Sequence, residues 1–274
     1  MSGPEDRPAG EAAVRRHGTT GLPPVSVVSV TRRNAAALVR TLSSLVGWAR
    51  YIELVVVEGD DRRSADYAAV QEWVAEHFPR FVWSRAPDGG PYDAMNRGLM
   101  ASSGEWVWFL NAGDTVADGV VPADVMARLE AGGDATLWAI FDSTTDGNGR
   151  AVRRSFARDY TEQGLRSGSY MACHQAVLTR RLTLANLGGF APGYEISADY
   201  EVFLRCAREG PPLLCEGTLV VSEDGGLHTR RFGRLLWEKR RARRSLVDQD
   251  ATDWVVDLLR TLKRMASTRT RAVR

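Results

Sequence analysis

Short runs of apolar, mostly β-branched residues alternate with helical patterns between residues 25 and 110, and this alternation constrains the fold more than any other feature. The runs VSVVSV, IELVVV and WVWFL show little polar alternation, which is typical of strands buried on both faces. A shorter run at 81–84 is a further candidate strand, and helical patterns fill residues 34–45, 64–77 and 92–102. Strands and helices that alternate with short connections predict a largely parallel sheet covered by helices on both faces.

The rest of the chain has a less regular pattern. Residues 136–141 and 152–156 are expected to pair as strands across a turn at 146–149. The remaining expectations are helices at 120–129, 197–209, 230–247 and 253–265, and strands near 173–179, 213–215 and 218–222. We therefore expect a disordered leader at residues 1–22, an α/β domain at 23–226 and a basic helical tail at 227–274.

Charge is divided unevenly along the chain. Residues 227–274 carry 14 Lys and Arg against 5 Asp and Glu, out of 36 and 34 in the whole chain. The tail is therefore basic and the body acidic, which predicts an anionic partner. A hydrophobic fraction of 44% and a charged fraction of 26% exclude a wholly disordered chain and a disulfide scaffold.

Targeting signals and cysteine usage favour a cytoplasmic protein. The sequence contains no run of about 18 apolar residues, so no transmembrane helix is expected. Residues 1–21 lack the apolar core of a signal peptide. The three cysteines are odd in number and lack the spacing of a metal site, which favours a reducing compartment.

Carboxylates follow three successive strands of the predicted sheet. Glu58, Asp60 and Asp61 follow the second strand, Asp88 the third and Asp114 the fourth. The carboxyl ends of parallel strands share one edge, where α/β sheets bind ligands. Converging carboxylates repel one another unless a cation compensates, and Mg²⁺ is usually held by one or two of them together with substrate phosphates. The pattern favours a site for a nucleoside diphosphate with Mg²⁺ or Mn²⁺, although acidic residues are also common in turns.

Two common nucleotide-binding signatures are missing after the first strand. Neither a Walker-type Gly-rich loop with lysine nor a G-x-G-x-x-G motif is present there. The sequence therefore supports neither a P-loop phosphotransferase nor a dinucleotide-dependent oxidoreductase.

The motifs VSVVSVTRRN, VVVEGD, APDGGPYDAMNRG, WVWFLNAGD, CHQAVL and SADYEVFLRC follow one another along the chain. This set resembles the family-2 glycosyltransferases of the GT-A fold, and most of all the bacterial branch that builds exopolysaccharides, including colanic-acid-type enzymes. The resemblance covers about residues 25–226. It implies a GT-A nucleotide-sugar-binding fold, with a mostly parallel central sheet flanked by helices and a C-terminal helical extension. It also implies a nucleotide-binding half at 23–118 and an acceptor half at 119–226.

The resemblance implies a set of donor-binding residues. The end of the first strand forms the pocket for the nucleotide base and ribose, and acids after the next two strands contact them. Glu58 stands where Asp is commoner in the family, which leaves the base preference open. The donor-binding candidates are Val30, Thr31, Arg32, Glu58, Asp88, Asp93, Asn96 and Asn111.

The resemblance also implies a catalytic base and a metal ligand. Asp199 matches the base that takes the proton of the acceptor hydroxyl in an inverting transfer. Asp114 is the one carboxylate kept where the family has Asp-x-Asp, which makes it the candidate ligand of Mg²⁺ or Mn²⁺. His228 is a second candidate metal ligand. Capping of a nearby helix is the alternative role for both Asp114 and Asp199.

Further polar residues are expected near the sugar, the acceptor and the phosphates. His174 and Gln175 match a polar pair that the family places near the sugar and the acceptor. Arg230 and Arg231, the tail bases nearest to the body, are candidates for binding the donor diphosphate.

The basic tail is open to three interpretations. Its helix either packs its apolar side on the body or lies on an anionic membrane surface, where each base contributes on the order of 1 kcal/mol. Nucleic-acid binding is the third, and the acidic body and the missing motifs disfavour it. A peripheral position at the inner face of the cell membrane would suit a lipid-linked acceptor.

The sequence thus predicts an inverting, metal-dependent transfer of a sugar from a UDP- or GDP-sugar to a hydroxyl of a glycan, lipid-linked or natural-product acceptor. A nucleotidyltransferase is one alternative. A non-catalytic nucleotide-sugar-binding homologue is another, because Asn111 and Gly113 stand in place of carboxylates. The sugar and the oligomeric state stay open, and a homodimer is compatible with the sequence.

Overall fold

One mixed sheet runs through the structure, a computed structural model that describes residues 14–16, 24–60, 64–147, 150–223 and 231–247. Its strands in these ranges are β1 (Val14–Arg16), β2 (Val25–Thr31), β3 (Ile52–Glu58), β4 (Phe81–Arg85), β5 (Trp106–Phe109), β6 (Thr115–Val116), β7 (Trp138–Gly147), β8 (Arg150–Ser155), β9 (Val177–Arg180) and β10 (Leu213–Glu223). They pair in the order β1-β4-β3-β2-β5-β9-β7-β10-β6, and β8 pairs with β7 outside this path.

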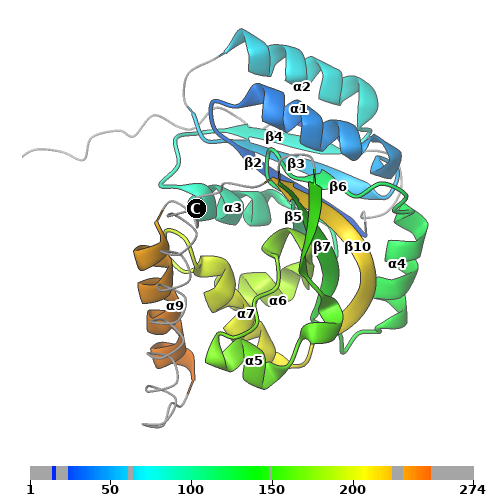
Figure 1. Ribbon diagram of the computed structural model, residues 1–274. Coiled ribbons are helices and arrows are strands. Elements are labelled where there is room, and N and C mark those ends of the chain that lie inside the picture. Colours follow the sequence, from blue (N-terminus) through cyan, green and yellow to red (C-terminus); the bar gives the residue numbers. More distant parts are fainter. Residues whose placement is uncertain (1–13, 17–23, 61–63, 148–149, 224–230, 248–274) are drawn as a thin grey trace, which may run out of the picture.

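Helices cover both faces of the sheet (Figure 1). The helices of the described ranges are α1 (Ala35–Ser44), α2 (Ala65–His77), α3 (Pro91–Ala101), α4 (Pro122–Ala131), α5 (Glu162–Ser167), α6 (Arg181–Asn186), α7 (Ala198–Glu209) and α9 (Phe232–Leu246). In Figure 1, α1 and α2 lie over one face, and α3, α6 and α7 lie over the other. The buried apolar side chains accordingly form two clusters, one on each face of the sheet.

The four strands β2, β3, β4 and β5 are parallel to one another, as their sequence predicts. β2 is parallel to β3 and to β5, and β4 is parallel to β3. Every residue of β3 is buried, which accounts for its nearly unbroken apolar run. Asn34 caps α1, because its side-chain oxygen accepts the N–H of Ala37 at 3.1 Å. The carboxyl ends of β2, β3, β4 and β5 therefore lie at one edge of the sheet.

The second half contains both parallel and antiparallel pairs. β7 and β8 are antiparallel as expected, but residues 143–147 of β7 make this pairing, so Asp146 and Gly147 belong to the strand and not to the turn. The expected strand at 136–141 forms the first part of β7 and pairs with β9 and β10 instead. β10 is parallel to β7 and is one long strand with irregular register near Cys215 and Thr218, where the sequence suggests two strands. The strand expected at 173–179 is confirmed only from Val177, because His174–Ala176 forms a 3-10 turn before β9 inserts between β5 and β7.

The two ends of the chain are described in part. The expectation of a disordered leader is wrong for Val14–Arg16, which pairs antiparallel with β4 through its backbone and so needs no apolar pattern of its own. The first helix expected in the tail is confirmed as α9, which contacts α7. The second, expected at 253–265, lies outside the described residues. No helix in the described ranges is long and apolar enough to cross a membrane.

Candidate active site

A cavity of about 510 Å³ opens where α3, α7 and α9 meet the strands of the second half of the sheet. It brings together five of the residues predicted from the sequence, although they come from three separate segments of the chain. These residues are Asn111, Asp114, His174, Gln175 and Asp199. The cavity is also lined by Tyr92, Cys173, Glu195, Glu223 and Lys239.

Asp114 lies in the turn that follows β5. The N–H of Gly113 donates to the hydroxyl of Thr41 on α1 at 2.9 Å, which holds the turn against that helix. Gly113 has a φ of +110°, and a Cβ there would come within 2.3 Å of the Glu223 carboxylate. Glycine therefore permits the close approach of this turn to the end of β10.

The Asp114 carboxylate is buried and accepts hydrogen bonds on both oxygens. Oδ2 accepts from Gln175 Nε2 at 2.9 Å, and Oδ1 accepts from the N–H of Glu223 at 3.0 Å. Desolvation raises the pKa of Asp114 to about 6 and the nearby negative charge of Glu223 adds to this, while both hydrogen bonds work in the opposite direction. The charged group that shifts this pKa is the carboxylate of Glu223, so the environment of Asp114 would suit a bound cation.

His174 lies between the Asp114 turn and the start of α7. Its Nε2 is 3.2 Å from Asn111 Nδ2, and its Nδ1 is 3.7 Å from Asp199 Oδ2. An amide nitrogen can only donate, so Nε2 accepts and the proton of the neutral ring is on Nδ1, facing Asp199. His174 thus links the residues that the sequence assigns to the donor and to the base.

Asp199 lies in the first turn of α7, at the positive end of the helix dipole. Its Oδ1 accepts the N–H of Tyr200 at 2.8 Å and the hydroxyl of Tyr92 at 3.2 Å. The single proton of this hydroxyl is shared with the carbonyl of Ile196, which lies closer, at 2.7 Å. Burial, followed by the charge of Asp199, raises the pKa of Tyr92 well above its usual value, so Tyr92 remains a hydrogen-bond donor.

A second group of predicted residues lies around the ends of β2, β3 and β4, outside the lining of this cavity. Thr31 is buried, and its hydroxyl is 2.8 Å from that of Tyr67. Val30 is half-buried and packs against the core. Asp88 Oδ1 accepts the N–H of Gly90 at 3.1 Å and is 4.0 Å from Arg32 Nη1.

Glu58 is fully buried at the end of β3, in an unexpected setting. The sheet register places it beside Arg85 of β4, and its Oε2 accepts from Arg85 Nε at 2.9 Å and from Trp83 Nε1 at 3.3 Å. Its Oε1 is buried without a hydrogen-bond partner in the described part of the chain. One oxygen of Glu58 is therefore taken by the protein itself.

Two predicted donor contacts on α3 are engaged within the protein. The amide group of Asn96 bonds both backbone groups of Phe190, accepting its N–H at 2.8 Å and donating to its carbonyl at 2.9 Å. Asp93 accepts the N–H of Gly89 and pairs with Arg97 at 2.6 Å. For Asn96 this geometry favours bracing of the loop after α6 over the predicted contact with the donor.

The tail contributes one described residue of the predicted set. Arg231 forms an ion pair with Glu195 at 2.8 Å, so its guanidinium already has a partner beside the cavity. Arg230 and His228 lie outside the described residues.

The comparison with protein families decides which class of enzyme this arrangement belongs to. The family model described as "Glycosyl transferase family 2" matches residues 26–187. The chain belongs to glycosyltransferase family 2. The match covers the four parallel strands, the Asp114 turn and the His174-Gln175 pair, and it ends before Asp199. The alternative of a nucleotidyltransferase is not supported.

Two similar proteins come from mycobacteria. This glycosyltransferase is 31% identical over 220 residues to an uncharacterized glycosyltransferase of Mycobacterium tuberculosis, covering 77% of this chain and 79% of the relative. It is 30% identical over 224 residues to a "PGL/p-HBAD biosynthesis glycosyltransferase" of Mycobacterium bovis, covering 75% of this chain and 79% of the relative. These names support an enzyme and do not specifically support the exopolysaccharide branch.

Solved structures agree on the GT-A fold of this glycosyltransferase. Staphylococcus aureus TarS in complex with UDP-GlcNAc matches with a TM-score of 0.64 at 15% identity, over 84% of this chain and 69% of that one. The mannosyltransferase PcManGT from Pyrobaculum calidifontis, solved with GDP-Man and Mn²⁺, matches with a TM-score of 0.61 at 18% identity, over 85% and 66%. At these identities the likeness shows the fold.

Two lining residues of the glycosyltransferase were missed by the sequence argument. Tyr92 resembles a packing residue in the sequence, and only the contact with α7 reveals its hydroxyl at Asp199. Glu223 ends β10, and the same reasoning that singled out Glu58 and Asp114 at strand ends could have found it.

The residues around Asp114 fit a divalent cation whose remaining ligands would come from the phosphates of the donor. No group of three or more His, Cys, Asp or Glu side chains in the described ranges is arranged as a ready-made metal site. Asn111 Oδ1, however, is buried without a hydrogen-bond partner in the described part of the chain. A carboxylate with a raised pKa and an unsatisfied amide oxygen are hard oxygen ligands, which Mg²⁺ and Mn²⁺ accept together with phosphate oxygens.

Proposed function

We propose that this family-2 glycosyltransferase is inverting and metal-dependent, and that it moves a sugar from a UDP- or GDP-sugar to a hydroxyl group. The observation that carries the proposal is that Asp114 and Asp199 line one cavity, with His174 between the turn of the first and the helix of the second. Such a cavity offers a cation ligand for the diphosphate and a base for the acceptor in one place.

Asp199 is the proposed general base. Its carboxylate takes the proton of the acceptor hydroxyl while the acceptor oxygen bonds to the anomeric carbon. The bond from that carbon to the diphosphate oxygen breaks with its electron pair on the leaving nucleotide, and attack from the opposite side inverts the carbon. The Tyr92 hydroxyl and the start of α7 hold the carboxylate for this transfer.

Asp114 is the proposed protein carboxylate for Mg²⁺ or Mn²⁺, and Asn111, which lines the same cavity, is proposed to add its amide oxygen. A bound divalent cation supplies charge stabilisation for the leaving diphosphate. Gln175 orients Asp114 through its Nε2, and its Oε1 accepts from Cys173 Sγ at 3.0 Å, which fixes the direction of the amide. His228 stays a proposed second ligand, and Arg230 and Arg231 stay proposed phosphate contacts.

The donor base and ribose are proposed to bind at the ends of β2, β3 and β4, near Val30, Thr31, Arg32, Glu58 and Asp88. Support comes from the solved GT-A structures, which hold UDP-GlcNAc, UDP or GDP-Man. In the proposed pocket for the nucleotide base, one oxygen of Glu58 is already hydrogen-bonded to Arg85, so only the other oxygen is available to the donor. The acceptor is proposed to be a glycan, a lipid-linked glycan or a small natural product.

An exposed stripe on α9 supports a peripheral membrane position, at the cytoplasmic face of the cell membrane. The stripe consists of Arg234, Trp237, Arg241 and Arg244, which are exposed and lie three or four residues apart on one side of the helix. Trp237 is 53% exposed, and the guanidinium of Arg234 lies 5.0 Å from the centre of its ring. Arginines around an exposed tryptophan suit an anionic lipid surface.

The membrane proposal is tested by sedimentation with vesicles. Wild-type protein should bind vesicles that contain phosphatidylglycerol at low salt and leave them at high salt. Trp237→Ala should weaken binding severalfold, whereas Met100→Ala, which removes an exposed apolar side chain of α3, should not. Equal binding to purely zwitterionic vesicles would count against a charge-based surface.

The catalytic proposal is tested by calorimetric titration with UDP, GDP and dTDP, each with and without Mn²⁺, followed by a donor screen that measures released nucleotide. We expect binding of one nucleotide that Mn²⁺ strengthens, and release of that nucleotide from its sugar donor. Binding without release from any donor would favour the non-catalytic homologue. No metal-dependent nucleotide binding at all would exclude the metal-dependent transferase.

A further inference from the structure

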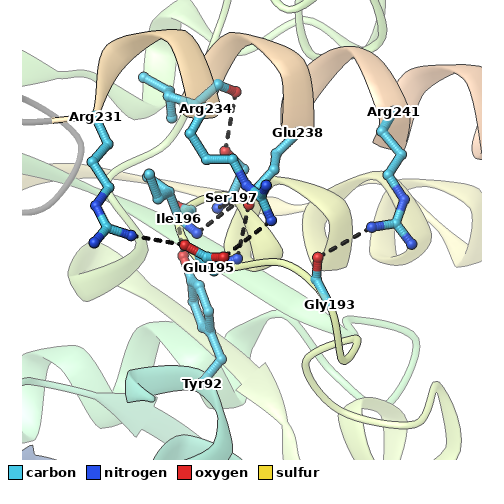
Figure 2. A network of polar contacts seen from close by, with 10 residues as sticks. Tyr92, Gly193, Glu195, Ile196, Ser197, Arg231, Arg234, Glu238 and Arg241 are labelled. Carbon is cyan, nitrogen blue, oxygen red and sulfur yellow. Dashed lines mark hydrogen bonds and ion pairs between the residues drawn. The ribbon is translucent and has the colours of Figure 1, made fainter. Parts of the chain in front are cut away.

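Glu238 is a fully buried carboxylate on α9 that no sequence motif singles out. It accepts three backbone hydrogen bonds from a segment far away in the sequence (Figure 2). Oε1 accepts the N–H of Glu195 at 2.9 Å, and Oε2 accepts those of Ile196 at 2.9 Å and Ser197 at 3.0 Å. Arg234, one turn earlier on α9, adds a fourth hydrogen bond from Nε to Oε1 at 2.8 Å.

The segment that Glu238 holds leads directly into α7 and Asp199. Ser197 is the N-cap residue of α7, but its side chain makes no capping bond to the helix. The N–H groups at a helix start have no partner within the helix, and those before them must also be satisfied when they are buried. Glu238, on α9, accepts the hydrogen bonds of the three N–H groups that precede α7, those of residues 195–197.

The same segment also fixes the Tyr92 hydroxyl, which reaches Asp199. The carbonyl of Ile196 accepts from Tyr92 at 2.7 Å, and Tyr92 also contacts Asp199 Oδ1 at 3.2 Å. The N–H of Ile196 points to Glu238, so this peptide segment is held from both sides. A shift of the 195–197 backbone would therefore move both Asp199 and its hydrogen-bond donor.

Glu238 is ionised in this setting. Burial opposes ionisation, but the hydrogen bonds from the N–H of Glu195, from Arg234 and from the N–H groups of Ile196 and Ser197 outweigh it and lower the pKa of Glu238. Hydrogen bonds to an ionised acceptor are about twice as strong as those between neutral groups. The contact is therefore stiffer than an ordinary packing contact between α7 and α9.

We propose that Glu238 is a positioning residue for the transfer reaction, because it fixes the 195–197 backbone that places Asp199 and Tyr92 at the cavity. Glu195 and Lys239, which flank this contact, both line the cavity. The inference rests on the proposed role of Asp199 as the base. It also gives α9 a role in the active site, beyond covering the body of the protein.

The first test is the split between turnover and donor binding in Glu238→Gln and Glu238→Ala. Gln keeps the size of the side chain but turns an NH₂ group toward backbone N–H donors, and Ala removes both acceptors. Nucleotide release from the donor identified by the screen should fall about tenfold or more in kcat, with KM and calorimetric donor affinity unchanged. Glu238→Asp, which keeps the carboxylate on a shorter stem, should recover part of the loss.

The matched control is Glu201→Gln. Glu201 is another buried carboxylate of the α7 region, and its partner is Arg205 at 2.6 Å on the same helix. It accepts no hydrogen bond from residues 195–197 in the described contacts, so its substitution should lower stability without a selective loss in kcat.

The second test does not depend on activity. Hydrogen exchange should be faster at the amides of Glu195, Ile196 and Ser197 in both Glu238→Gln and Glu238→Ala, and unchanged there in Glu201→Gln. Faster exchange with kcat within twofold of wild type would overturn the positioning role and leave a purely structural contact. Unchanged exchange would show that Glu238 does not hold the segment.

The two tests also separate this proposal from the proposed function. If the wild-type protein releases no nucleotide from any donor, the proposed function fails and the role in turnover fails with it, whatever the exchange result. If wild type turns over and Glu238→Gln does so equally well, only the positioning proposal fails.

Discussion

Two carboxylates line the same cavity in contrasting surroundings. Asp114 is buried in a turn, has the acidic Glu223 close by and carries a pKa raised to about 6. Asp199 lies at the start of a helix, where the dipole favours negative charge, and accepts from a backbone N–H and from the Tyr92 hydroxyl. Both carboxylates accept one backbone and one side-chain hydrogen bond, so they differ in the charge around them: another carboxylate lies close to Asp114, whereas Asp199 lies at the positive end of a helix dipole.

This difference supports two separate proposed roles for the two carboxylates of one cavity. A carboxylate that lacks a compensating charge gains most from a cation, because burial has already removed the water that would solvate it. A carboxylate at the positive end of a helix dipole has its charge stabilised by the protein itself, which leaves it available to take a proton from a bound hydroxyl. The assignment of roles therefore follows from the environment of each residue, and the experiments below test whether the two roles are separate.

The largest expected effect belongs to Asp199→Asn. An amide cannot take the acceptor proton, so kcat for nucleotide release should fall at least about a hundredfold. Donor affinity measured by calorimetry should stay within about twofold, because the Asp114 region is untouched. Unchanged turnover would exclude Asp199 as the base, and an equal loss of donor affinity would show that the two roles are not separate.

The next effect concerns pH and the Asp114 region. Since the pKa of Asp114 is raised to about 6, the carboxyl group is protonated below that pH and a proton competes with the cation. The Mn²⁺-dependent part of nucleotide affinity should be constant above pH 6 and fall by up to about tenfold for each pH unit below it. Calorimetry between pH 5 and 8, with UDP or GDP as the screen decides, measures this.

Asp114→Asn is the control for that pH dependence. The variant should bind nucleotide equally with and without Mn²⁺, and the slope below pH 6 should disappear. The effect of pH on folding stability is opposite in sign to its effect on Mn²⁺-dependent nucleotide binding. In metal-free protein a raised pKa gives a stability contribution that is present below the unfolded-state value and is lost as pH rises through about 6. A pH slope that survives in Asp114→Asn would assign it to another group.

The sequence predicts the parallel half of the fold well because burial on both faces leaves a plain signal. β2, β3 and β5 each carry a short apolar run. Because a helix and only short connections separate successive strands, neighbouring strands are expected to run parallel. For the same reason Asp114 could be found from its place after a strand. Asp199 was found from the resemblance of its segment to the family motif, since helical periodicity alone does not distinguish a base from a cap.

The sequence does not predict contacts between segments that are distant in the chain. Glu58 and Arg85 meet only because the register of β3 and β4 places them side by side. The amide group of Asn96 is hydrogen-bonded to the backbone of Phe190. Glu238 accepts hydrogen bonds from the segment before α7, which lies more than forty residues earlier in the sequence. Each of these depends on tertiary packing, which the local pattern of the chain does not contain.

The smallest expected effect is that of Tyr92→Phe, which tests how much the fixed donors contribute to Asp199. The variant keeps the ring, which stacks on Phe190 at 5.3 Å, and removes only the hydroxyl. Loss of one buried hydrogen bond should lower the free energy of unfolding by about 1 kcal/mol. We expect kcat to fall by about fivefold as well, with donor affinity unchanged, because Asp199 then loses its side-chain donor from α3.

Tyr200→Phe is the matched control for this last comparison. Its hydroxyl is also buried and also donates to a carbonyl at 2.7 Å, that of Leu165, but it does not contact the Asp199 carboxylate. The two variants should therefore lose similar stability, while only Tyr92→Phe loses turnover. Equal kcat values for the two variants would show that the start of α7 alone holds Asp199 and that the Tyr92 hydroxyl does not contribute to its position.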